Sequence, residues 1–131
     1  MNIGLVKECM TASLSGKANF GEMVMKLKEA DVERYIIDLI GLNQLTYGIN
    51  GEYLLASLRF VNPSKPSKSF NSPGIKKAIQ DSQQKKIDYP TFLRAIMAAG
   101  CCHYEVYIHG RKAIYFGCDG SHHIENFPTI S

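Results

Sequence analysis

Two stretches of the chain space their apolar residues as one buried helical face does, at i, i+3, i+4 and i+7. These residues are Phe20, Met23, Val24 and Leu27 in the first stretch and Tyr89, Phe92, Leu93 and Ile96 in the second. Asn19 and Asp88 stand just before them, where helix N-caps belong. The pattern predicts a helix after each cap, and Gly100 suits the left-handed end of the second helix.

A further helix is predicted before each of these two, at about 3–14 and about 73–84. Their inward faces would be formed by Val6, Cys9 and Met10 and by Ile75, Ala78 and Ile79. Ser72-Pro73 is a start signal for the later helix. Each half of the chain therefore begins with two helices.

Alternating residues typical of strands follow each helix pair, in YIIDLI and YEVYIH. Gly41-Leu42 and Gly110-Arg111 come next and suit two-residue type II′ turns. Asn50-Gly51 and Asp119-Gly120 then suit type I′ turns, before third strands at about 53–59 and 122–127. Each half is predicted to end in a three-stranded antiparallel meander.

The two halves are copies of one unit, because residues 17–51 align without a gap on residues 86–120. Identities fall at Lys17/Lys86, Ala30/Ala99, Tyr35/Tyr104, Gly41/Gly110, Gly48/Gly117 and Gly51/Gly120. We predict an α+β fold in a single domain, 1–131, built from repeats at about 3–60 and 73–128. A Pro- and Ser-rich loop, 61–72, joins them. The repeat leaves open whether the meanders form one six-stranded sheet or two facing sheets.

Two-residue turns would fix which side chains share a face of the second meander. One face would hold Val106, Ile108, Ala113, Tyr115 and Ile124 against the helices. The other would hold Ile114 and Phe116 together with a candidate ligand-facing group of Glu105, Tyr107, His109, His123 and Glu125. The equivalent face of the first meander is more apolar: Ile36, Ile40, Leu45, Tyr47, Leu54 and Ala56, with Asp38. We expect the two halves to pack on each other and cover these faces; the alternative is that a second protein molecule covers them.

The stretch 101–127 contains three of the four cysteines and all four histidines, which raises the question of a metal site. No C-x2-C pair, HExxH or HxH is present. The nearest approach to a site is His103 across from Cys118, with Cys101 on the same side, and no fourth ligand. Cys101 and Cys118 correspond to Val32 and Ile49 in the first repeat, which favours their role as small apolar residues. We therefore predict no metal and no cofactor.

Catalytic motifs are also missing, since the chain has no GxSxG, GxGxxG or P-loop. The 131 residues are 45% hydrophobic and 21% charged, as in an ordinary soluble domain. The net charge of +3, without a basic run, makes nucleic-acid binding unlikely. The start of the chain is not a signal peptide, and no apolar stretch approaches the length of a membrane span. We expect a cytoplasmic protein with free thiols.

The second half resembles the YbcV-like family of bacterial proteins, often labelled "phage envelope protein". The resemblance is carried by Lys86, Tyr89-Pro90, Phe92, Ala99-Gly100-Cys101, Tyr104, Val106, Gly110-Arg111-Lys112, Tyr115-Phe116-Gly117, Asp119-Gly120, His123, Glu125 and Phe127-Pro128. It covers about 70–128, and the first half is similar only loosely. The resemblance implies no activity and no binding residue.

Two functions follow from these observations. The first is a non-catalytic protein–protein or self-association module, a homodimer or a complex with another protein, because the meanders have apolar second faces. The alternative is a small-molecule-binding protein or enzyme that uses the polar face with Glu105, Tyr107, His109, His123 and Glu125.

Overall fold

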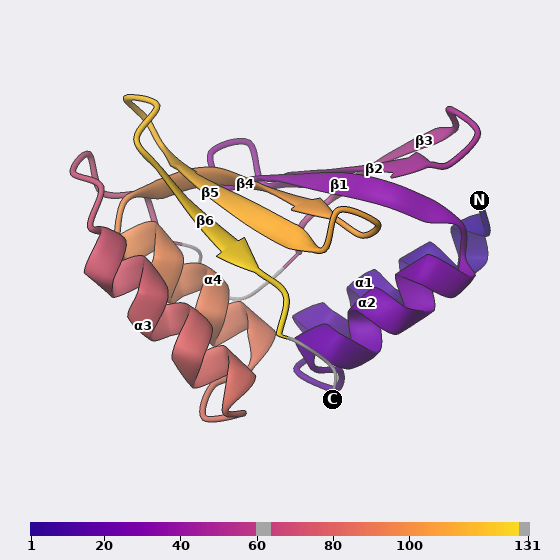
Figure 1. The fold of residues 1–131 in the computed structure, drawn as a ribbon, viewed down its shortest axis with the longest axis horizontal. Helices are drawn as coiled ribbons and strands as arrows, with labels where there is room; N and C mark the ends of the chain where they lie inside the picture. Colours follow the sequence, from indigo (N-terminus) through magenta and orange to yellow (C-terminus); the bar gives the residue numbers. More distant parts are fainter. Residues whose placement is uncertain (60–63, 129–131) are drawn as a thin grey trace.

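The computed structural model describes residues 1–59 and 64–128, and within these residues four helices cover one face of a single six-stranded sheet (Figure 1). The first repeat contains α1 (Ile3–Leu14), α2 (Phe20–Glu29), β1 (Val32–Asp38), β2 (Asn43–Gly48) and β3 (Tyr53–Ser57). The second contains α3 (Ser72–Gln83), α4 (Tyr89–Ala98), β4 (Cys101–Tyr107), β5 (Lys112–Gly117) and β6 (His122–Asn126). The predicted α+β class and the duplicated helix–helix–meander unit are confirmed.

The helices begin where their caps predict. The Asn19 side chain accepts a hydrogen bond from the Glu22 amide at 2.9 Å, and the Asp88 carboxylate accepts one from the Thr91 amide at 3.0 Å. α3 begins at Ser72 because Asn71 caps it, accepting from the Gly74 amide. Residues 60–63, which include the predicted end of the first repeat and the start of the 61–72 loop, lie outside the described residues.

The sheet has the strand order β3-β2-β1-β4-β5-β6 and is antiparallel throughout. β1 and β4 join the two meanders edge to edge, with Ile36 paired to Glu105. These two residues occupy equivalent positions of the repeats, so a pseudo-twofold axis passes through this pair. The expectation that the two halves cover each other's second faces is wrong, because one continuous sheet replaces the two facing ones.

Four-residue loops, 39–42 and 108–111, connect the first two strands of each meander, where two-residue turns were predicted. The left-handed residues in these loops are Leu42 (φ 55°) and Arg111 (φ 56°), and not the preceding glycines. Lys112 therefore pairs with Tyr107. A two-residue turn would have paired Lys112 with His109 instead. This shift of two residues leaves the side chains of β1, β2, β4 and β5 on their predicted faces, but it moves Ile40 and His109 from the predicted strands into the loops.

The turns before β3 and β6 contain three residues each. The Gly48 amide donates to the Glu52 carbonyl and the Gly117 amide to the Ser121 carbonyl, which leaves 49–51 and 118–120 in the loops. Only the last residue of each loop is left-handed, Gly51 at φ 84° and Gly120 at φ 87°. A type I′ turn needs positive φ at two residues, so the predicted turn type is wrong.

This single extra residue reverses the faces of β3 and β6 relative to the prediction. Ile124, expected against the helices, pairs with Ile114 on the open side of the sheet. His123 and Glu125, expected on the open side, pair with Tyr115 and Ala113 on the helical side. Leu54 and Ala56 move to the helical side in the same way, opposite Thr46 and Gln44.

The core lies between the sheet and the helices, where the large, fully buried side chains gather. They include Val6, Leu27, Ile75, Leu93 and Ile96 from the helices and Val32, Tyr35, Ile37, Tyr104 and Val106 from the sheet. No helix in 1–59 or 64–128 has the length and apolar character needed to cross a membrane.

Candidate functional site

No helix of residues 1–59 and 64–128 covers one side of the sheet, and we call this side the outer face (Figure 1). Strand pairing arranges its side chains in three rows across the six strands. The rows are Tyr53, Tyr47, Arg34, Tyr107, Lys112 and Asn126; Leu55, Leu45, Ile36, Glu105, Ile114 and Ile124; and Ser57, Asn43, Asp38, His103, Phe116 and His122. Every one of them is partly or fully exposed. The middle row is apolar except for Glu105.

The polar residues of the outer face bind one another across short distances. The Tyr107 hydroxyl donates to the Glu105 carboxylate at 2.5 Å, and this hydrogen bond, with partial burial, raises the pKa of Tyr107. The Arg34 guanidinium lies 4.0 Å from the centre of the Tyr47 ring. These contacts hold the Glu105 and Arg34 side chains beside aromatic side chains of the outer face.

The candidate ligand-facing group does not share a surface. Glu105 and Tyr107 are on the outer face, and His109 is exposed in the loop between β4 and β5. His123 and Glu125 lie on the helical side, where the His123 Nε2 is 3.0 Å from the Glu125 carboxylate. The prediction of one common face is therefore wrong, because it depended on a two-residue turn before β6.

The three candidate metal ligands are also separated. A bulge at Cys102 turns Cys101 into the core, while His103 lies on the outer face and stacks on Phe116 at 4.6 Å. His103 pairs with Phe116, so the expected pairing with Cys118 is wrong; Cys118 is exposed in the next loop. Among residues 1–59 and 64–128, no three or more histidine, cysteine or acidic side chains form a group that could hold a metal.

The buried thiols are poor nucleophiles. Burial raises the pKa of Cys101 to about 12, and the Cys101 thiol donates to the His103 carbonyl at 3.2 Å. Burial also raises the pKa of Cys102 to about 11, with a further contribution from the neighbouring Cys118 thiol. Both thiols stay protonated near neutral pH, which favours their role as small core residues.

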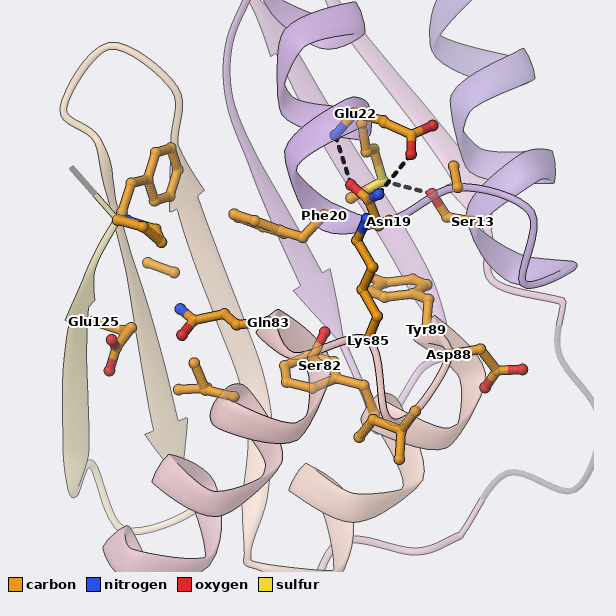
Figure 2. A pocket seen from close by; sticks show the side chains of 18 of the residues that line it. Ser13, Asn19, Phe20, Glu22, Ser82, Gln83, Lys85, Asp88, Tyr89 and Glu125 are labelled. Carbon is orange, nitrogen blue, oxygen red and sulfur yellow. Dashed lines mark hydrogen bonds between the residues drawn. The ribbon is translucent and has the colours of Figure 1, made fainter. Parts of the chain in front are cut away.

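A pocket of about 350 Å³ lies on the helical side, between the two helix hairpins and the β6 side of the sheet (Figure 2). The loop between α1 and α2 forms one side of its mouth, and the loop between α3 and α4 forms the other. Equivalent residues of both repeats therefore line it: Lys17 and Lys86, Asn19 and Asp88, Phe20 and Tyr89, Met23 and Phe92. Its volume is at the lower end of the range of small-molecule sites.

The wall that the sheet contributes to the pocket comes from the second repeat. Tyr104, Ala113, Tyr115 and Glu125 of the sheet line it, and Phe127 closes it by an edge contact with Phe20 at 5.3 Å. The Tyr89 and Tyr104 hydroxyls are hydrogen-bonded to each other, and burial raises the pKa of both phenols. The phenols of the pocket interior thus remain uncharged near neutral pH, and the Glu125 carboxylate lines the same wall.

Sequence reasoning missed this pocket because its residues come from two hairpin loops that are far apart along the chain. Identical lysines at Lys17 and Lys86 were visible in the repeat, but nothing in the repeat showed that both loops lie at one opening. Glu125 was predicted as a candidate for a different surface.

The fold and these surfaces define a small α+β protein in which two helix-hairpin and meander units share one sheet about a pseudo-twofold axis. The chain belongs to the family described as protein of unknown function (DUF1398), which matches residues 9–126. Comparison with curated proteins gives no match.

Proposed function

We propose that this protein is a self-association module, in which the outer faces of two copies pack on each other. The observation that carries the proposal is the uncovered middle row, where Leu55, Leu45 and Ile36 lie on one side of Glu105 and Ile114 and Ile124 lie on the other. Leu55 is 61% exposed and Ile124 48% exposed. Five apolar residues in one row of six, each partly or fully exposed, are typical of an interface.

The charges of the outer face favour a second copy over another class of partner. Arg34 and Lys112 balance Asp38 and Glu105, so the face attracts neither a polyanion nor a polycation. A twofold axis parallel to the strands would place the first repeat of one copy over the second repeat of the other. Asp38 then lies over His103 of the second copy.

The same arrangement places the other residues of the three rows opposite one another, with Ile36 over Glu105 of the second copy at the centre. It places Leu45 over Ile114 and Leu55 over Ile124 of the second copy, and it places Tyr47 over Lys112. Six strands about 4.8 Å apart, with three outward residues about 6.8 Å apart on each, give a face of roughly 600 Å². Two such faces reach only the lower end of the usual interface size, so we expect a dissociation constant in the micromolar range.

Light scattering coupled to size-exclusion chromatography tests the proposal between about 10 and about 200 µM protein. The wild-type chain should move from monomer to dimer over this range. Ile114→Lys puts a charge in the middle row, next to Glu105, and should weaken dimerisation by at least about tenfold.

Met25→Lys is the matched control, since Met25 is 65% exposed on α2, on the helical side of the molecule. It should leave dimerisation unchanged. A wild-type chain that stays monomeric at the highest concentration would overturn the proposal. So would a dimer that Leu55→Lys on the edge strand β3 breaks but Ile114→Lys does not, because that result would show edge-to-edge pairing.

We also propose that the protein is a relative of the YbcV-like proteins and that it is cytoplasmic. The motifs from Lys86 to Pro128 support a place near the YbcV-like proteins, and the free cysteines support a location in the cytoplasm.

A further inference from the structure

We propose that the pocket between the helix hairpins binds a small anion with an apolar or aromatic body, such as an aromatic carboxylate. The body would lie among Phe20, Tyr89 and Tyr115, and the anionic group would lie at the mouth beside Lys85. This site is on the opposite side of the sheet from the outer face, so the inference stands apart from the proposed dimer.

The walls of the pocket suit an apolar body. Rings surround it from three directions: Phe20 from α2, Tyr89 and Phe92 from α4, and Tyr104 and Tyr115 from the sheet. Figure 2 shows Phe20 extending across the centre of this space, with Gln83 and Glu125 on the far side. Aromatic rings bury large apolar areas in ligand sites, and few polar groups are needed to orient a ligand.

Among the described residues, the lining of the pocket contains three lysines and three acidic residues. Lys17, Lys85 and Lys86 line the pocket, and within the described part of the chain none of them has an ion-pair partner. The three acidic residues of the lining are each engaged. Glu22 accepts from the Asn19 amide group at 2.5 Å, Asp88 caps α4, and Glu125 is paired with His123. These carboxylates keep their charge but are already hydrogen-bonded, whereas the three exposed ammonium groups are not held in ion pairs by any described residue and can turn toward an anionic ligand.

The backbone at Lys85 adds an independent observation. Lys85 has a φ of 59°, a left-handed conformation that costs free energy for any residue with a Cβ. The equivalent residue of the first repeat is Gly16, at φ 77°, which adopts this conformation without that cost. A glycine at position 85 would adopt this conformation at a lower cost in free energy. What the lysine adds at this position is its charged side chain. Figure 2 shows this side chain extending toward Asn19 on the opposite hairpin.

The first repeat supplies a comparison. Equivalent positions of α1 and β3, among them Met10, Leu14 and Ala56, line a separate hollow, and none of the described residues in its lining is aromatic. The three tyrosines of the aromatic wall, Tyr89, Tyr104 and Tyr115, and the Glu125 carboxylate all come from the second repeat.

Titration of the ¹⁵N-labelled protein with sodium benzoate, followed by NMR, tests this site, with benzylamine as the cationic counterpart of the same shape. Benzoate should produce saturable shifts at the amides of 16–20 and 83–89, and benzylamine should bind at least about fivefold more weakly. Running the titration in the Ile114→Lys variant separates the result from dimerisation.

Lys85→Gly distinguishes a binding role from a structural one. It should raise the urea midpoint, because the strain is removed, and it should weaken benzoate binding by at least about fivefold. Lys85→Arg should keep the affinity, and Lys28→Gln, which removes a lysine outside the pocket, should not change it. Three results would each overturn the proposal: no saturable benzoate shifts, equal binding of benzylamine, or unchanged benzoate affinity in Lys85→Gly.

Discussion

At the scale of single residues, the left-handed backbone positions of residues 1–59 and 64–128 form four pairs at equivalent places in the two repeats. The pairs are Gly16 and Lys85, Asp31 and Gly100, Leu42 and Arg111, and Gly51 and Gly120. Only some of these positions require glycine. A Cβ on Gly100 would lie 2.2 Å from the Ser69 carbonyl oxygen, whereas its equivalent Asp31 is accommodated. The backbone path is therefore repeated even where the residue type is not.

Tyr35 and Tyr104, another pair of equivalent residues, show how the absence of one neighbouring hydroxyl group changes a buried environment. Tyr104 is hydrogen-bonded to Tyr89, but Tyr35, its equivalent, has a buried hydroxyl with no partner among the described residues. The residue equivalent to Tyr89 is Phe20, which has no hydroxyl. Burial raises the pKa of Tyr35 far above its usual range, so the phenol stays neutral.

Replacing Tyr35 with Phe should raise the free energy of unfolding by about 1 kcal/mol, because an unsatisfied buried donor is removed. Tyr104→Phe should lower it by about 1 kcal/mol, since the Tyr89 hydroxyl then loses its partner. Urea unfolding of both variants measures the difference. A loss of stability in Tyr35→Phe as large as that in Tyr104→Phe would show that the Tyr35 hydroxyl does have a partner.

At the scale of elements, the length of one turn decides which surface a strand supplies. Helix ends, inward helical residues and strand positions follow from caps and periodicity, which are local signals. The faces of β3 and β6 do not, because Asn50-Gly51 and Asp119-Gly120 suit both a two-residue turn and the three-residue loop that forms. The local sequence does not distinguish them, and the two choices put His123 and Glu125 on opposite sides of the sheet.

Ile124→Lys tests the register of β6. Because Ile124 points away from the helices, the variant should change the free energy of unfolding by no more than about 0.5 kcal/mol. In the register that a two-residue turn would give, the same lysine would be buried in the core and would cost roughly 3 kcal/mol or more. Unfolding at about 1 µM protein, where the proposed dimer is dissociated, gives the measurement.

At the scale of the whole molecule, the pairing of β1 with β4 turns two units into one domain. Each unit alone would expose the unpaired edge of β1 or β4, where the two halves of the sheet meet in the full chain. Each unit would also lose part of the shared core, because α1 and α4 contact each other across the two repeats. The pocket depends on the same joining, since both hairpin loops form its mouth.

We expect that fragments 1–66 and 67–131, expressed separately, do not fold as monomers and recover the native circular dichroism spectrum when mixed in equal amounts. The reason is that each fragment lacks the strand that completes its sheet. The full chain, cleaved once after residue 66, is the control and should stay folded. Cooperative unfolding of either fragment alone, as a monomer, would contradict this expectation.

The sequence by itself determined the helices and the strands, because caps and periodicity act over short distances along the chain. The sequence also determined the duplicated unit, because the two halves align directly with each other. It also determined that Cys101 is a small core residue, since Val32 fills the same place in the first copy. Only the tertiary structure decided that the meanders share one sheet, that β6 turns Glu125 toward the helices, and that two distant loops form one pocket. These features depend on pairing between residues far apart in sequence, and local patterns do not specify that pairing.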